Sequence, residues 1–121
     1  ILDRYVDKFV ITEQLYTHSG EKKKQNFDLD NFKRFKDKII YFLIEKEPDD
    51  LFTIQKSNIN HQGLKRLNSL KRIQLQYNKL YDGLSDALDS DLVLVSDCDE
   101  IPNKNTLKLT NEPLKRCELG S

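Results

Sequence analysis

The residue types best suited to chemistry lie together at Asp97, Asp99 and Glu100, directly after the apolar run Leu92–Val95. The two aspartates flank one residue in a tight loop, so both carboxylates can be directed toward a common point. Hard oxygen donors of this kind suit Mg²⁺ or Mn²⁺, which usually keep waters and take further ligands from substrate phosphates. The spacing alone is equally compatible with a solvated acidic strand end in which Asp97 caps the following turn.

The position of these carboxylates favours a metal site over a solvated turn. Three negative charges after a buried strand repel one another, and a bound cation is the simplest way to relieve that repulsion. The sequence therefore predicts Asp97 and Asp99 as metal ligands, with Glu100 as a third or outer carboxylate.

The elements that position this cluster follow an alternating pattern. Strands are predicted at Lys8–Glu13, Ile39–Ile44 and Leu92–Val95, and a short helix begins near Asp28, with Asp28 or Asp30 as its cap. Continuous apolar strands alternating with helices indicate an α/β fold, with a mostly parallel sheet flanked by helices. Ligands of such sheets collect at the carboxyl ends of the strands, where the carboxylate cluster lies.

The longest predicted helix follows Gly63. Its apolar residues step by three or four along one stripe, which is predicted to face the core: Leu64, Leu67, Leu70, Ile73, Tyr77, Leu80, Leu84 and Leu88. The spacing of Leu2, Tyr5 and Val6 also predicts the tail of a helix before the first strand. Residues 15–27 and 48–62 are polar and are predicted to be loops.

Two segments resemble a known family. The run DLVLVSDCDEIPN resembles the metal-binding Asp-x-Asp region of GT-A glycosyltransferases, and specifically that of glycosyltransferase family 17. The run FVITEQLYTHSGEKKKQNF is similar to a second family segment, with the matching residues Glu13, Thr17, Gly20, Lys23 and Phe27. Of an Arg-Glu-x-x-Gln-Arg-like element on the long helix, only Arg72 and Gln76 match.

The resemblance implies a Rossmann-like GT-A fold, of which this chain is a central fragment. It implies transfer of a sugar, N-acetylglucosamine from a UDP donor, to a glycan hydroxyl with inversion, assisted by Mn²⁺ or Mg²⁺. The donor-binding residues are then Asp97, Asp99, Lys23, Thr17, Gly20 and Arg72. An inverting transfer also needs a carboxylate base. Glu13 is the candidate within this chain, and the base can equally lie in a region beyond it.

Two other functions remain open from the residues. An apolar strand followed by Asp-x-Asp also resembles the first motif of haloacid-dehalogenase phosphatases, although that motif normally opens its domain and is not followed by Glu100, Ile101 and Pro102. The other alternative is a non-catalytic binding module that retains the acidic loop.

Composition limits the function further. The 121 residues suit one domain, predicted over 1–119, with 120–121 set apart as a possible remnant of protein production. Twenty basic and twenty acidic residues give a net charge of zero, which disfavours nucleic acid as a partner. No run is long and apolar enough to span a bilayer. Cys98 and Cys117 are predicted to be free thiols, which, without a leader, favours a cytoplasmic or peripheral membrane location.

Overall fold

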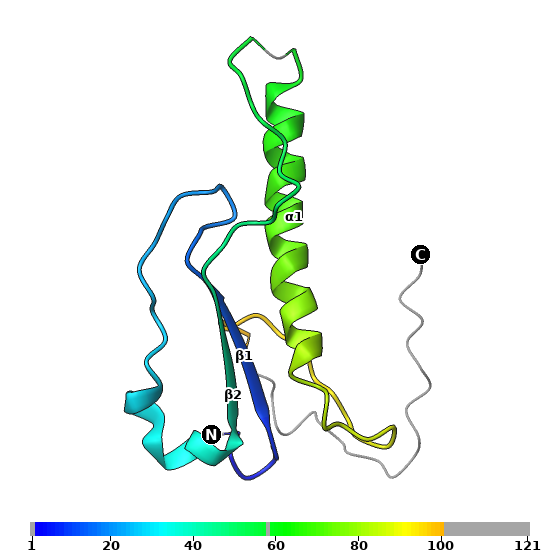
Figure 1. The fold of residues 1–121 in the computed structure, drawn as a ribbon. Helices are drawn as coiled ribbons and strands as arrows, with labels where there is room; N and C mark the ends of the chain where they lie inside the picture. Colours follow the sequence, from blue (N-terminus) through cyan, green and yellow to red (C-terminus); the bar gives the residue numbers. More distant parts are fainter. Residues whose placement is uncertain (1, 58, 101–121) are drawn as a thin grey trace. The chain divides into compact units, whose positions relative to one another are not determined.

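The computed structural model describes residues 2–57 and 59–100. The chain divides into two compact units, Ile1–Asp86 and Ala87–Ser121, and each is considered by itself. The first unit contains β1 (Phe9–Gln14), the 3-10 helix η1 (Leu29–Lys38), β2 (Ile39–Ile44) and α1 (His61–Asp82) (Figure 1). The predicted α/β character is therefore confirmed, as are the first two strands and the long helix.

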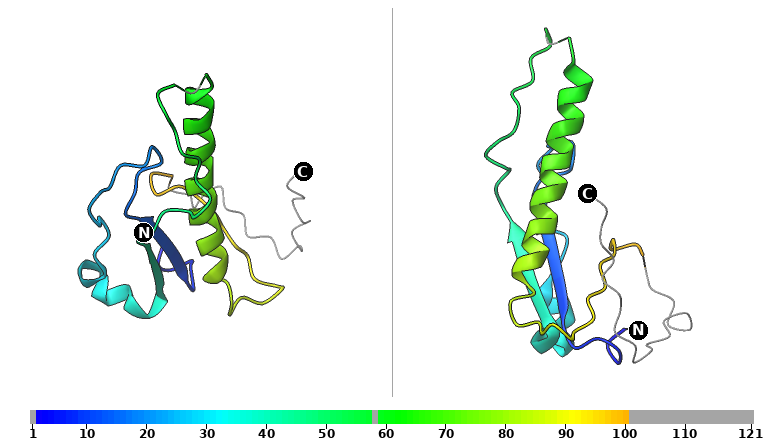
Figure 2. Two further views of the ribbon diagram at one scale, coloured as in Figure 1. Left: turned by 45° about the horizontal axis from the view of Figure 1, so that its top comes forward. Right: turned by 90° about the vertical axis from the view of Figure 1, so that its right-hand side faces the viewer.

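The sheet has two parallel strands, with Phe9 opposite Ile39 and Gln14 opposite Ile44. Both strands therefore end at the same edge, and the chain leaves each one at that edge. After β1 it forms the loop 15–27, and after β2 it forms the connection 45–60, which runs alongside α1 (Figure 2). The two loops that follow the strands are thus the segments able to hold a ligand in this unit.

Helix η1 begins where the sequence predicts. The Asp28 carboxylate accepts a hydrogen bond from the amide of Asp30 at 2.9 Å, which caps the first turn. The Phe27 ring stacks on Phe32 with centroids 5.1 Å apart and also lies against Tyr41, at 4.9 Å. These ring contacts hold the start of η1 against the middle of β2.

The predicted helix before β1 is wrong. Residues 3–5 form a turn, in which the amide of Tyr5 donates to the carbonyl of Leu2. The ammonium of Lys38 accounts for the difference, because it binds the carbonyls of Asp3 and Val6 and the carboxylate of Asp3. Those carbonyls are thereby drawn toward the start of β2.

Helix α1 faces the sheet with a different side from the one that the leucine stripe predicts. Leu67, Leu70 and Tyr77 are 43%, 51% and 44% exposed, whereas Asn68 and Arg72 are buried. The helix also ends at Asp82, before Leu84 and Leu88. The predicted apolar core stripe is therefore covered only in part, with its other members on α1 half-buried, because a two-stranded sheet is too narrow to cover the whole stripe.

A polar seam attaches α1 to the rest of the unit. We use this name for Asn68, Arg72 and Gln76, which are four residues apart and so lie along one side of the helix. The Asn68 amide bonds both the N–H and the C=O of Phe52, each at 2.8 Å, and Gln76 donates to the carbonyl of Thr12 at 3.2 Å. These polar contacts therefore determine the position of α1 against the rest of the unit.

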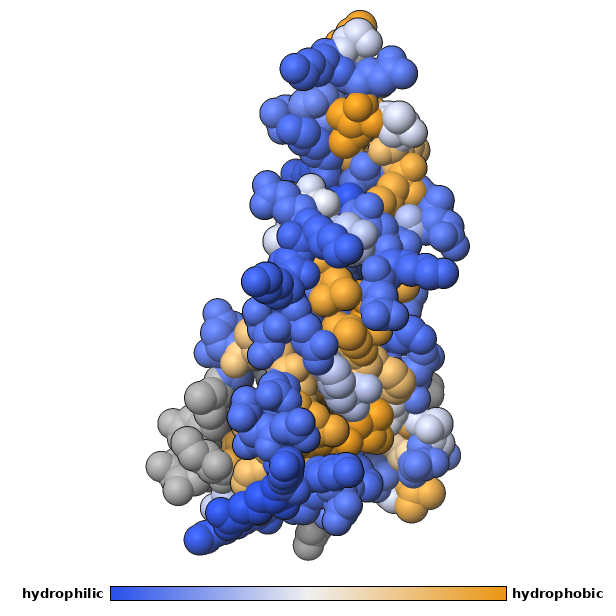
Figure 3. All heavy atoms as spheres, turned by 60° about the vertical axis from the view of Figure 1, so that its left-hand side comes forward, coloured by the Kyte–Doolittle hydropathy of each residue, from blue (hydrophilic) through white to orange (hydrophobic). Residues whose placement is uncertain are grey.

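Little apolar surface is fully buried. Among the described residues, Ile44 is the only buried hydrophobic side chain, while Gln14, Asn68 and Arg72 are buried polar residues. The space-filling view shows apolar side chains reaching the surface among polar ones (Figure 3). No helix in the described ranges has both the length and the apolar character needed to cross a membrane.

In the second unit, the predicted strand Leu92–Val95 does not form. Its four side chains are between 47% and 59% exposed, and no strand occurs within residues 87–100. The backbone bonds here close two turns, from the amide of Asp91 to the carbonyl of Leu88 and from that of Glu100 to that of Asp97. An apolar, β-branched run becomes a strand only when another strand pairs with it, and these residues supply none.

The polar seam makes a prediction about stability. Replacing Asn68 with Ala removes both hydrogen bonds to Phe52 and leaves partly buried backbone groups unpaired, so the free energy of unfolding should fall by about 2 kcal/mol. Chemical denaturation measures this loss. Asn78→Ala is the matched control, because the Asn78 side chain pairs with Gln74 on the exposed face of the same helix. Equal losses in the two variants would contradict the role given to the seam.

Candidate functional site

The candidate site of the first unit lies at the carboxyl ends of β1 and β2. Glu13, near the end of β1, directs its carboxylate toward the loop 15–27. One oxygen accepts from Lys23 at 2.8 Å and from the amide of Asn26 at 2.6 Å. The other accepts from the amide of Phe27 at 2.9 Å and from the Tyr41 hydroxyl at 3.0 Å. One carboxylate thus holds the second half of the loop to both strands.

These contacts set the acidity of Glu13. Burial, which leaves its side chain 11% exposed, would raise the pKa of the carboxyl group, but hydrogen bonds from Lys23, Asn26, Phe27 and Tyr41 outweigh it and lower the pKa to about 2. Burial and the bond to Glu13 together raise the pKa of Tyr41 to about 12. A carboxylate with four donors and so low a pKa is suited to anchoring a loop, and poorly suited to accepting a proton as a general base.

The first half of the loop folds on itself. Thr17 Oγ1 accepts from the amide of Glu21 at 3.0 Å and contacts Ser19 Oγ at 2.9 Å. The amide of Thr17 donates to the carbonyl of Glu21, and Tyr16 pairs with Lys22 in an antiparallel bridge. Gly20 has φ of +94°, a conformation that other residues rarely adopt. The tip of the loop is therefore a defined turn.

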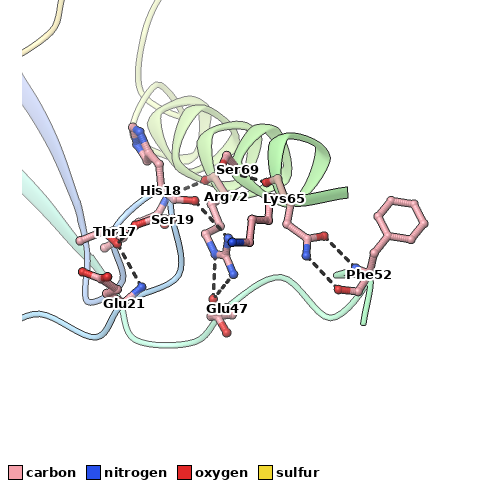
Figure 4. Close-up of polar contacts among 11 residues, drawn as sticks. Thr17, His18, Ser19, Glu21, Glu47, Phe52, Lys65, Ser69 and Arg72 are labelled. Carbon is pink, nitrogen blue, oxygen red and sulfur yellow. Dashed lines mark hydrogen bonds and ion pairs between the residues drawn. The ribbon is translucent and has the colours of Figure 1, made fainter. Parts of the chain in front are cut away.

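Arg72 joins this tip to the segment after β2 (Figure 4). Its Nε and Nη2 each lie 2.7 Å from one carboxylate oxygen of Glu47, and Nη1 donates to the carbonyl of His18 at 3.1 Å. The backbone carbonyl of Arg72 accepts from the side chain of Gln14, the last residue of β1. The residues predicted for the site in this unit thus form two groups. Arg72 contacts the Thr17–Gly20 tip, and Lys23, a predicted donor-binding residue, pairs with Glu13, the predicted base.

The second unit contains the predicted metal ligands. Asp97, Asp99 and Glu100 lie in or beside one exposed turn, in which Glu100 donates its amide to the carbonyl of Asp97, and its carboxylate accepts from the amide of Asp97 at 3.2 Å. Across residues 2–57 and 59–100, no three His, Cys, Asp or Glu side chains are grouped so that they could hold a metal ion. The Glu100 carboxylate here accepts a hydrogen bond from the backbone amide of Asp97. The assignment of Asp97, Asp99 and Glu100 as metal ligands stays a prediction.

The donor chemistry at this turn still fits a hard divalent cation. Asp97 and Asp99 supply carboxylate oxygens from one short exposed segment, and Mg²⁺ commonly binds through one or two carboxylates while its other ligands come from water and phosphate. Cys98 between them is a free, exposed thiol.

Sequence reasoning missed three contributors to the first unit's site. No sequence motif pointed to Glu47, Asn68 or Tyr41, although each forms a hydrogen bond with a residue or segment of the site. The four-residue spacing of Asn68, Arg72 and Gln76 was the available signal. It was hidden by the more conspicuous leucine stripe on the same helix.

The fold and site define an α/β domain in which the loops after the parallel strands carry charged and hydroxyl side chains. The model of glycosyltransferase family 17 matches residues 1–120, nearly the whole chain. The chain therefore belongs to glycosyltransferase family 17, as its two motifs predict. Comparison with curated proteins finds no match, and comparison with solved structures finds none either.

The pKa of Glu13 makes a prediction about pH. A carboxyl pKa lowered from 4.5 to about 2 by folding stabilises the native state above pH 4.5, and this stabilisation is lost as the pH falls from 4.5 toward 2. Glu13→Gln should therefore cost roughly 2 kcal/mol at pH 7 and almost nothing near pH 2.

Urea denaturation at several pH values measures this difference. Glu45→Gln is the control, because Glu45 is exposed just after β2. A cost for Glu13→Gln that does not change with pH would contradict the network described for Glu13.

Proposed function

We propose that this chain is the donor-binding part of a GT-A glycosyltransferase that transfers N-acetylglucosamine from UDP to a glycan hydroxyl with inversion. The observation that carries the proposal is the family match over residues 1–120, which spans both the acidic turn and the loop after β1. Membership of a glycosyltransferase family also favours this function over a dehalogenase-like phosphatase.

The parallel sheet supports the same assignment. In open α/β sheets, ligands bind outside the carboxyl ends of the strands. In the first unit the loop at this edge carries the hydroxyl group of Thr17 and the ammonium group of Lys23. A nucleoside diphosphate is anionic, and the chain has no net charge to attract it, so local cations and hydroxyl groups must supply the attraction.

We assign Asp97 and Asp99 as the residues that would hold Mn²⁺ or Mg²⁺, with Glu100 beside them. When bound, such an ion supplies positive charge that offsets the charge developing on the departing diphosphate. Glu13 anchors the loop 15–27 through Lys23, Asn26 and Phe27, so in this proposal it orients the donor site and does not remove the acceptor's proton.

Metal-dependent nucleotide binding tests the proposal. Titration calorimetry should show UDP binding that requires Mn²⁺, and Asp97→Ala and Asp99→Ala should each weaken it at least about tenfold, because the nucleotide loses its bridging charge. Asp89→Ala is the control, since Asp89 is an exposed carboxylate of the same unit outside the acidic turn.

Two results would overturn the assignment. UDP binding that is unchanged by removing Mn²⁺ would refute the metal's role. Hydrolysis of a simple phosphate ester that disappears in Asp97→Asn would identify a phosphatase instead.

A further inference from the structure

The contacts of Arg72 suggest a role other than direct binding of a ligand. The residue is 8% exposed, and its guanidinium group donates toward Glu47 through Nε and Nη2 and toward the carbonyl of His18 through Nη1. A carboxylate thus offsets its charge within the protein. An arginine in this state has less positive charge to offer to a diphosphate than an exposed one.

The loop tip rests directly on this guanidinium group. A Cβ atom built at Gly20 would lie 2.5 Å from Nη2 and 2.9 Å from Cζ of Arg72, so a larger residue here would displace the end of the Arg72 side chain. The positive φ of Gly20 independently favours glycine. The planar fork of Arg72 is therefore the surface against which the Thr17–Glu21 turn is held.

The geometry points to Arg72 and Glu47 as a positioning pair: Glu47 orients the Arg72 fork, and the fork fixes the Thr17–Glu21 turn in the shape that receives the donor. This inference rests on the proposed function for the identity of the ligand. The pair acts through the loop and touches neither the nucleotide nor the sugar. Lysine cannot replace arginine here, because a single ammonium group lacks the fork that reaches Glu47 and His18 together.

Variants of Arg72 test the effect on binding. At a temperature where every variant is folded, Arg72→Gln should weaken Mn²⁺-dependent UDP binding by about tenfold relative to the unaltered chain. Arg72→Lys should bind with an affinity between those of the unaltered chain and Arg72→Gln. Lys79→Gln is the matched control, because it also removes a cation from α1. The partner of Lys79 is the exposed Asp82 and not the loop. An affinity within twofold of the unaltered chain in Arg72→Gln would overturn the inference.

Cleavage by a lysine-specific protease tests the loop itself. The loop contains Lys22, Lys23 and Lys24, while Lys36 in η1 serves as an internal reference. Arg72→Gln should accelerate cleavage in the loop about tenfold relative to Lys36, whereas general destabilisation would accelerate both equally. Equal acceleration at the two places would refute the positioning role.

A second variant covers the case in which Arg72→Gln does not fold. Glu47→Gln keeps an oxygen that can accept from Arg72 and removes the charge that orients the fork, so loop cleavage should rise by a smaller factor, with Lys36 unchanged. Unchanged loop cleavage in Glu47→Gln would exclude the pair. If the unaltered chain does not bind UDP, the proposed function fails, and the cleavage ratios still decide whether the pair positions the loop.

Discussion

The guanidinium group of Arg72 is the contact on which the first unit's arrangement depends most. It donates to Glu47 after β2 and to the carbonyl of His18 in the loop after β1. The backbone carbonyl of the same residue accepts a hydrogen bond from the Gln14 side chain at the end of β1. Because Ile44 is the only buried hydrophobic side chain in the described ranges, apolar burial gives α1 little directional constraint. Hydrogen bonds have defined geometry, and they determine where the helix lies.

This arrangement prepares a loop before any ligand binds. Arg72 holds the tip of the loop 15–27, and Glu13 holds its second half through a carboxylate that accepts four hydrogen bonds. A loop already in its binding shape avoids the entropy cost of becoming ordered when the donor arrives. Under the proposed function, the ligand of this loop is a large and charged nucleotide sugar, for which a rigid loop at the strand ends is suited.

The sequence predicted elements whose signals are local. β1, β2 and the cap at Asp28 follow from short patterns, and the family motifs brought Thr17, Gly20 and Lys23 into one loop. Prediction from the sequence failed where the structure of a segment depends on a partner distant in the chain. Leu92–Val95 has the composition of a strand but pairs with no other strand among the described residues. The seating of α1 was missed for the same reason, since Asn68 is buried only because Phe52 lies opposite.

Backbone amide hydrogen exchange in the unaltered chain at neutral pH tests most directly whether the loop 15–27 is preformed. The amides of Glu21, Lys23, Asn26 and Phe27 donate to Thr17 Oγ1, to the carbonyl of Leu15 and to the two oxygens of Glu13, respectively. They should exchange at least about a hundredfold more slowly than unstructured amides, as hydrogen-bonded native amides do. Exchange of all four at the unstructured rate, while β1 stays protected, would contradict the account.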